Sequence, residues 1–244
     1  MSAWLTAAPI AHRGYHDMNR AIWENTLPAF QRAIDAGFAI ECDIHLSADG
    51  VPVVFHDDDL KRLCGREGAI EDLTAAEAKT IAVGGTKATI PTLADLLAAC
   101  GGRVPLVIEL KASRADPAAF AEATLAALAG YDGPVALMSF DTALLSALKQ
   151  AGTGQPLGLT AEGKDEEALA AHRKAFAIGL DFVSYYYDHL PNEFVAGLRA
   201  RDVPVITWTV RNEDARRRTF QNADQMTFEG FDPRQSEPLQ TPGT

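Results

Sequence analysis

The chain has 244 residues, of which 47% are hydrophobic and 23% are charged, and these proportions are typical of a globular protein that buries a sizeable core. Its 22 Lys and Arg residues are outnumbered by 33 Asp and Glu residues. The resulting net charge of −11 argues against binding to nucleic acid or to anionic membranes, because both require clustered basic residues.

The cysteines and the N-terminal residues indicate a cytoplasmic location. The 3 cysteines are too few and too scattered for a disulfide framework or a zinc site, so we expect reduced thiols. The first residues lack a basic start followed by a long apolar run, and no stretch reaches 18 apolar residues. We therefore expect neither a signal peptide nor a membrane anchor.

Short apolar runs alternate with helix-like stretches along most of the chain. The expected strands are Pro9–His12, Phe38–Leu46, Pro105–Lys111, Pro134–Phe140, Pro156–Thr160, Asp181–Tyr187, Pro204–Val210 and Asp224–Phe231. The expected helices are Leu27–Ala36, Thr92–Cys100, Pro117–Ala129, Thr142–Gln150, Glu166–Ile178 and Asn192–Arg201. This alternation predicts an α/β fold in which a parallel sheet closes into a (β/α)₈ TIM barrel, as one domain over residues 1–244. A doubly wound open sheet is the alternative, but no G-x-G-x-x-G pattern follows an early strand.

A β-hairpin is expected directly after the second strand. Asp49-Gly50 separates two apolar runs, and this pair favours a two-residue type I′ turn. Such a turn would place Asp43 opposite His56 on the paired strands.

Two segments fall outside the alternation. We expect residues 57–90 to form a small insertion of turns with one helix near Thr74–Thr80. The acidic run Asp57–Asp59 at its start is typical of a solvated loop. The tail over residues 232–244, rich in Pro, Gln and Thr, is expected to be loose.

Charged side chains follow the first three barrel strands where each strand ends. His12 and Arg13 end the first strand, and His56 follows the hairpin. Glu-x-Asp at Glu41 and Asp43 lies near the end of the second strand, and Glu-x-Lys at Glu109 and Lys111 ends the third. Active sites of TIM barrels are built at the carboxyl ends of the strands, so these side chains should meet at one rim.

Three facing carboxylates would repel one another and resist ionisation unless a cation lies between them. Carboxylate oxygens are the ligands of hard ions, so the cluster indicates Mg²⁺ or Ca²⁺ and not zinc. Arg13 and Lys111 would add positive charge that suits a phosphoryl group, and two histidines can exchange protons with its oxygens near neutral pH. A plain ion pair between Glu109 and Lys111 is the alternative for those two residues.

These residues belong to a longer series of matches in chain order: His12-Arg13-Gly14, Glu24-Asn25-Thr26, Phe30, Ala33, Gly37, Glu41-x-Asp43, Asp49-Gly50, His56-Asp57, Ile90-Pro-Thr-Leu93, Ile108-Glu-Leu-Lys111, Ser139-Phe140 and Trp208-Thr-Val210. In this series the chain resembles the glycerophosphodiester phosphodiesterase family. The resemblance implies a TIM barrel with a short insertion after the hairpin and a requirement for a divalent metal.

The resemblance also implies roles for individual residues. Glu41, Asp43 and Glu109 would hold the metal, Arg13 and Lys111 would contact the phosphate, and His12 and His56 would form the acid/base pair. Of the two orders open for this pair, we expect His12 to be the acid and His56 the base. Trp208 either packs in the core or forms an apolar wall for the glycerol moiety. The implied reaction converts a small glycerophosphodiester to glycerol 3-phosphate and an alcohol, with water or the glycerol 2-hydroxyl as the attacking group.

Two positions depart from the family pattern. Arg211 follows the Trp-Thr-Val run where the family usually has Asn, and Glu229 ends the last strand where the family usually has Asp. We expect both to lie across the rim from the metal ligands and to affect the choice of alcohol, with Arg211 accepting a second anionic group. His16 and His45 are expected at the surface or around the site.

Three other functions remain open at this level. A metal-independent phosphatidylinositol phospholipase C also uses two histidines, but the three carboxylates argue against it. A lysophospholipase D would share the same rim with a different substrate. A non-catalytic barrel that binds phosphodiesters is the third alternative.

Overall fold

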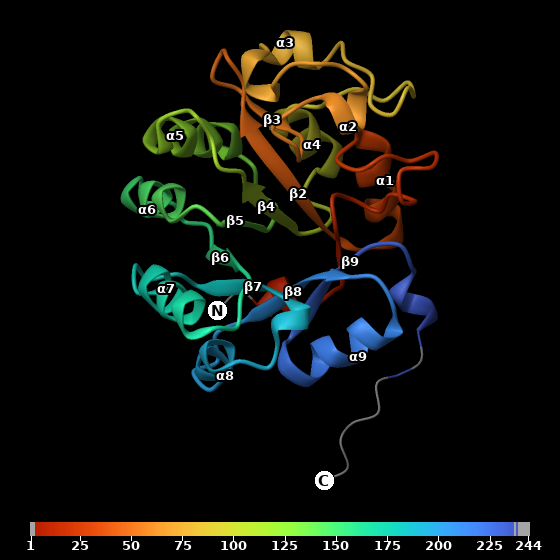
Figure 1. The fold of residues 1–244 in the computed structure, drawn as a ribbon. Coiled ribbons are helices and arrows are strands. Elements are labelled where there is room, and N and C mark those ends of the chain that lie inside the picture. Colours follow the sequence, from red (N-terminus) through yellow and green to blue (C-terminus); the bar gives the residue numbers. More distant parts are fainter. Residues whose placement is uncertain (1–2, 237, 239–244) are drawn as a thin grey trace.

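In the computed structural model, which describes residues 3–236 and 238, eight parallel strands close into a barrel (Figure 1). Around the barrel they are β1 (Ile10–Ala11), β2 (Ala39–Leu46), β4 (Leu106–Leu110), β5 (Val135–Ser139), β6 (Leu157–Ala161), β7 (Phe182–Tyr186), β8 (Val205–Val210) and β9 (Gln225–Phe228). The short strand β1 pairs with both β2 and β9 and so closes the ring. The predicted TIM barrel is confirmed.

Helices lie on the outside of the barrel in Figure 1. They are α1 (Leu27–Ala36), α4 (Leu93–Cys100), α5 (Pro117–Leu128), α6 (Thr142–Gln150), α7 (Glu166–Phe176), α8 (Glu193–Arg199) and α9 (Glu213–Asn222). Each of α5 to α9 begins after an Asp or Asn whose side chain accepts a backbone N–H of the first turn. Such caps satisfy donors that the helix itself cannot pair, and they fix where each helix starts after its strand.

An apolar layer fills the barrel interior near the amino ends of the strands. It consists of Leu5, Ile10, Ala39, Val107, Ala136, Met138, Phe182 and Ile206. Gly158 on β6 makes room for the large ring in this layer, because a Cβ at that position would lie 2.3 Å from Phe182. The interior is therefore packed at this end, and the cavity lies towards the carboxyl ends of the strands.

The hairpin forms, but its predicted register is wrong by one residue. Strand β3 (Pro52–Val54) pairs antiparallel with β2 so that Ile44 faces Val54. The loop has three residues, with Gly50 at a φ of 75°, because the Ser47 side chain accepts the N–H of Val51. A three-residue loop with a left-handed glycine is the next most common hairpin connection.

As a result, Asp43 lies opposite Phe55, whose N–H donates to the Asp43 carbonyl at 3.0 Å. His56 still comes close to Asp43, since both side chains line the same cavity.

The insertion has a small apolar core of its own. Residues 57–90 contain the short helices α2 (Lys61–Cys64) and α3 (Ala75–Ala78) and a 3₁₀ turn at Ile70–Asp72. Buried apolar side chains of this segment pack on Val53 and Phe55 of the hairpin. Helix α3 lies within the expected helical segment, and Thr74 caps it.

The tail is partly ordered, contrary to expectation. The Asp232 side chain caps a 3₁₀ turn at Pro233–Gln235, and the Arg234 guanidinium lies 4.9 Å from the centre of the Phe38 ring. Residues 237 and 239–244 of the predicted loose tail lie outside the described residues. Within the described part of the chain, every helix is too short or too polar to cross a bilayer.

Candidate active site

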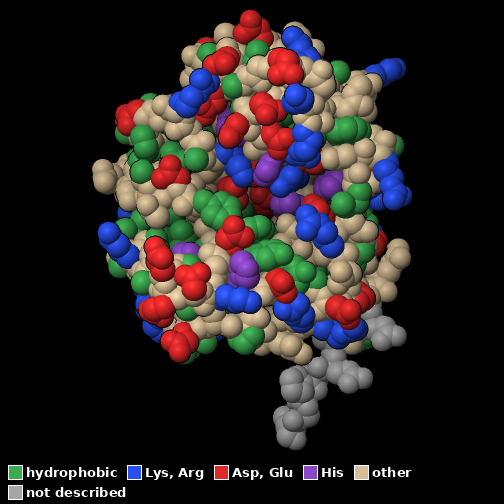
Figure 2. Space-filling view, viewed as in Figure 1, with side chains coloured by type: hydrophobic (Ala, Val, Ile, Leu, Met, Phe, Trp, Pro, Cys, Tyr) green, Lys and Arg blue, Asp and Glu red, His purple; other side chains and the backbone are tan. Residues whose placement is uncertain are grey.

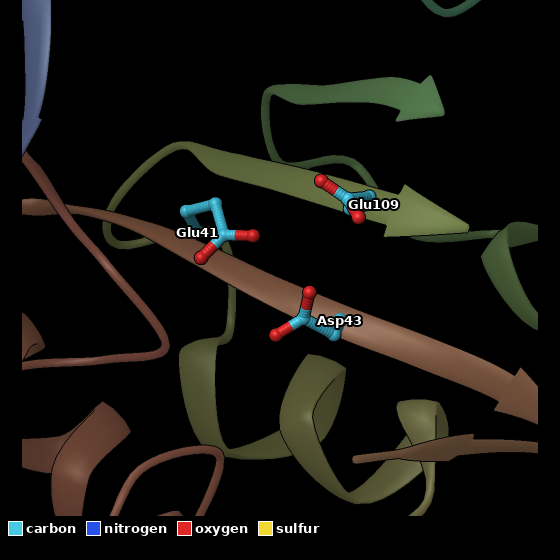
Figure 3. A group of neighbouring side chains, drawn as sticks. All are labelled: Glu41, Asp43 and Glu109. Carbon is cyan, nitrogen blue, oxygen red and sulfur yellow. The ribbon is translucent and has the colours of Figure 1, made fainter. Parts of the chain in front are cut away.

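Three buried carboxylates meet inside the barrel, two from the middle of β2 and one near the carboxyl end of β4. Side chains alternate along a strand, so Glu41 and Asp43 point to the same side of β2, and Glu109 on β4 is the direct neighbour of Asp43. One oxygen from each of the three lies within 4.8 Å of the others. Figure 3 shows the three carboxylates turned towards one space inside the barrel. The structure thus brings the three predicted metal ligands together.

The electrostatics of the cluster fit a bound cation. Burial raises the pKa of Glu41 well above its ordinary value, and the charges of Asp43 and Glu109 raise it further. Burial also raises the pKa of Glu109. Burial alone would raise the pKa of Asp43 too, but Lys111 and Arg13 hold it below its usual range. Oxygen ligands in this number and spacing suit Mg²⁺ or Ca²⁺, whose charge would let all three carboxylates ionise.

Lys111 and Arg13 lie against the carboxylate cluster. Lys111 Nζ is 2.7 Å from a Glu109 oxygen and 3.5 Å from an Asp43 oxygen, so the Glu109–Lys111 ion pair considered above is present within the cluster. Arg13 Nε is 3.4 Å from Asp43. Arg13 also has a φ of 53°, unusual for a residue other than glycine, and its backbone N–H donates to Glu41 at 2.8 Å.

His12 is held by the carboxylate of Glu229. The Nδ1–H of His12 donates to Glu229 Oε2 at 2.6 Å, and its Nε2 lies 4.0 Å from Glu41. Burial lowers the pKa of His12, and the hydrogen bond to Glu229 opposes this effect. For Glu229, burial would raise the pKa, but the hydrogen bond from His12 and the nearby ring of His16 hold it far below its ordinary value.

The two departures from the family pattern contact each other. Arg211 Nε donates to Glu229 Oε1 at 2.7 Å, and Glu229 in turn holds His12. The expectation that Glu229 lies across the rim from the metal ligands is therefore wrong. The contact between Glu229 and His12 was not expected, because β9 and β1 are far apart in the sequence and become neighbours only where the barrel closes.

Neither His16 nor His45 lies at the surface. The N–H of Met18 donates to His16 Nδ1, which leaves a proton on Nε2, and this atom faces Glu229 at 3.4 Å. His45 on β2 is fully buried and its Nε2 contacts the carbonyl oxygen of His56. Of the two positions expected from the sequence, at the surface or around the site, both histidines therefore take the second.

His56 lies on the loop after β3 with its Nδ1 2.7 Å from Asp57 Oδ1. Its side chain is 28% exposed, and burial lowers its pKa. Asp57 is partly buried between His56 and Arg62, whereas Asp58 and Asp59 are exposed, so the predicted solvated run begins one residue later than expected.

Aromatic side chains form the opposite side of the cavity. Phe140 follows β5, Tyr186 ends β7 and Trp208 lies within β8. The Trp208 ring centre lies 5.6 Å from that of Phe140 and 5.2 Å from that of Tyr186. The Trp208 indole N–H donates to the carbonyl oxygen of Ser184 at 3.2 Å. Trp208 therefore both packs against neighbouring rings and lines the cavity. Phe140 was not predicted to line the cavity, although it ends the expected strand Pro134–Phe140 and belongs to the Ser139-Phe140 match.

The cavity between the two sides is small, at about 180 Å³, compared with the ~300–1,000 Å³ of typical ligand pockets. In Figure 2 basic and histidine side chains surround the central hollow, acidic side chains lie in its depth, and hydrophobic side chains border its lower side. The hydroxyls of Thr160, Ser184 and Thr227 also line it, and none has a hydrogen-bond partner among the described residues. The cavity suits a small polar molecule with an anionic centre.

Comparisons with known proteins agree with this geometry. The model of the Glycerophosphoryl diester phosphodiesterase family matches residues 12–230. A glycerophosphodiester phosphodiesterase of Caldanaerobacter subterraneus subsp. tengcongensis is 31% identical over 221 residues, which cover 85% of this chain and 88% of the relative.

Solved structures share the fold over nearly the whole chain. A phosphodiesterase of Oleispira antarctica, in complex with the product sn-glycerol-3-phosphate, is 25% identical with a TM-score of 0.81, and the match covers 91% of this chain and 92% of that one. A glycerophosphodiester phosphodiesterase of Thermotoga maritima is 27% identical with a TM-score of 0.72, and the match covers 91% and 93% of the two chains.

Proposed function

Because the chain belongs to the glycerophosphoryl diester phosphodiesterase family, we propose that it hydrolyses small glycerophosphodiesters to glycerol 3-phosphate and an alcohol, with a divalent metal and two histidines. The observation that carries the proposal is the buried cluster of Glu41, Asp43 and Glu109 with two basic side chains against it. The product complex of the Oleispira antarctica phosphodiesterase supports the choice of substrate.

The charged side of the cavity would bind the phosphate. Glu41, Asp43 and Glu109 would hold Mg²⁺ or Ca²⁺, and the bound ion supplies positive charge next to a phosphoryl oxygen. Arg13 and Lys111 both reach Asp43, so their charges lie beside the cluster. Charged donors placed in advance stabilise the negative charge that develops on phosphoryl oxygens in the transition state.

The two histidines would move the protons. His12 donates its Nδ1–H to Glu229, so the second proton of its imidazolium form would lie on Nε2, and from that atom it would protonate the departing alkoxide and become neutral. His56 has the corresponding contact with Asp57 and would take the proton from the attacking oxygen. Each carboxylate fixes the ring orientation that its histidine needs.

The direct test is release of glycerol 3-phosphate from a panel of glycerophosphodiesters, among them the choline, ethanolamine and glycerol diesters. We expect turnover that EDTA abolishes and that Mg²⁺ or Ca²⁺ restores, while His12→Ala should lower turnover by about 10²- to 10⁴-fold. Lysophosphatidylcholine serves as the comparison substrate and should be turned over poorly, because the cavity is small.

Other outcomes would contradict the proposal in distinguishable ways. Activity that EDTA leaves unchanged would indicate a metal-independent enzyme of the phospholipase C type. Binding of the diesters without release of product would indicate a non-catalytic barrel.

A further inference from the structure

The guanidinium of Arg62 binds two carboxylates at once. Arg62 lies in α2 of the insertion, and its Nη1 and Nη2 donate to the two oxygens of Glu24 at 3.0 and 2.9 Å. Its Nε and Nη2 donate to the two oxygens of Asp57, each at 2.7 Å. Paired hydrogen bonds of this kind fix the relative orientation of the two groups as well as their distance.

Each of these carboxylates has a second partner in the candidate active site. Asp57 Oδ1 contacts His56 Nδ1 at 2.7 Å, and Glu24 Oε1 accepts from Arg13 Nη1 at 2.6 Å. Two continuous chains of hydrogen bonds therefore start at Arg62. One ends on a histidine of the site, and the other ends on the arginine beside the carboxylate cluster.

The groups at the ends of these chains have few other constraints. His56 follows the end of β3, on a segment without strand pairing, and its side chain is 28% exposed. Arg13 Nε has no hydrogen bond to any described residue, although it lies 3.4 Å from Asp43. Asp57 and Glu24 thus accept the side-chain hydrogen bonds that orient these two groups, while the charge of Asp43 also attracts Arg13, and Arg62 holds both accepting carboxylates.

We propose that Arg62 is a positioning residue for the reaction: it orients His56 through Asp57 and Arg13 through Glu24. The inference rests on the proposed function, because these orientations matter only if the site acts on a phosphodiester. It also gives the insertion a role: when α2 packs with Arg62 on Glu24, the same contacts orient His56 and Arg13 in the site.

The two chains of hydrogen bonds predict a separation between kcat and KM. Asp57→Asn should lower mainly kcat, since it loosens the proposed base His56. Glu24→Gln should raise mainly KM, since it loosens Arg13 at the phosphate. Arg62→Ala should change both and lower kcat/KM about 10- to 100-fold, because displacement of a reacting group by about 1 Å costs on this scale.

Matched variants separate positioning from folding. Arg66 lies in the same insertion, is exposed and contacts no described residue through a hydrogen bond or ion pair, so Arg66→Ala should retain wild-type kinetics within about 2-fold. Arg62→Lys keeps the charge but lacks the planar fork, so it should still lose about 10-fold in kcat/KM. Millimolar guanidinium should restore part of the Arg62→Ala activity, whereas ammonium should not.

The double variant Asp57→Asn/Arg62→Ala gives a further check. Its kcat should equal that of Asp57→Asn alone, because both changes break the same chain of hydrogen bonds. If the wild type releases glycerol 3-phosphate but Arg62→Ala, Arg62→Lys and Asp57→Asn all keep its kcat/KM within 2-fold, the positioning role is wrong and the proposed function stands. A lower melting temperature of Arg62→Ala with unchanged kinetics would likewise show that Arg62 stabilises the fold and does not position the reacting groups. No product from the wild type would overturn the proposed function itself.

Discussion

The two sides of the cavity are built in different ways. The charged side is formed by β1, β2, β4, the loop after β1, the residue after β9 and the insertion. Most of its side chains have two or more polar partners: Glu229 contacts His12, His16 and Arg211, and Glu24 binds Arg13, Asn19 and Arg62. On the aromatic side the contacts are between rings, and Phe140 is 45% exposed.

This difference indicates on which side of the cavity side chains can be substituted at a small cost in free energy. A network of charged hydrogen bonds tolerates little displacement, because a buried group that loses its partner pays the full desolvation penalty. Ring contacts are less directional, so side chains can be exchanged at smaller cost. We therefore expect the charged side to determine the reaction and the aromatic side to select the alcohol.

The largest effect is expected at the two histidines. His12→Ala and His56→Ala should each lower kcat by about 10²- to 10⁴-fold, because each removes a proposed proton-transfer group. Steady-state rates with a glycerophosphodiester measure the loss, and thermal unfolding shows whether the fold is retained. Near-normal turnover in a folded variant would contradict the role of that histidine and would weaken the contrast between the two sides.

An effect on stability is expected at Glu24. Burial alone would raise its pKa, but hydrogen bonds from Arg62 and the charge of Arg13 lower it to about 2. A carboxylate with a lowered pKa stabilises the fold fully above its unfolded pKa, here about 4.5, and this contribution is lost as the pH falls towards 2. Its size is at most about 3 kcal/mol.

Urea unfolding of the wild type and Glu24→Gln between pH 7 and pH 3 measures this contribution. The difference in unfolding free energy should be constant near neutral pH and should shrink below pH 4.5. Glu67→Gln, at a side chain that is 88% exposed in the same insertion, should show no such trend. A difference that stays constant down to pH 3 would show that the charge of Glu24 does not contribute.

The smallest effects are expected on the aromatic side. Trp208→Ala should raise KM by about 2- to 13-fold, since an aromatic contact is worth about 0.5–1.5 kcal/mol, and Phe140→Ala should change it less because that ring is more exposed. The changes should differ between the choline and glycerol diesters. Equal losses for every diester, mainly in kcat, would show that the aromatic side also serves the chemical step.

Most residues of the charged side could be predicted from their spacing along the sequence. Glu41-x-Asp43 on a strand must share a face, and alternation of strands and helices predicted that Glu109 would lie on the neighbouring strand. Regular periodicity of this kind also predicted the barrel, whose eight strands are observed close to the expected positions.

What could not be predicted depends on contacts between distant or irregular segments. Glu229 reaches His12 across 217 residues through the closure of the barrel, and nothing local indicates that pair. Arg62 and Asp57 lie on an insertion without periodicity, where a run of acidic residues favours a solvated loop. The hairpin register was wrong because the Ser47 hydroxyl, and not the Asp-Gly pair alone, determines the turn.

The apolar layer behind the cavity has a kinetic consequence. Because Phe182 and its neighbours fill the barrel towards the amino ends of the strands, the cavity has no second exit at that end of the described barrel. Under the proposed reaction, both products must leave through the mouth by which the substrate entered. The alcohol can depart while glycerol 3-phosphate, with the greater negative charge, is still held by Arg13 and Lys111. Turnover would then be limited by the release of this second product, which should inhibit in competition with the substrate.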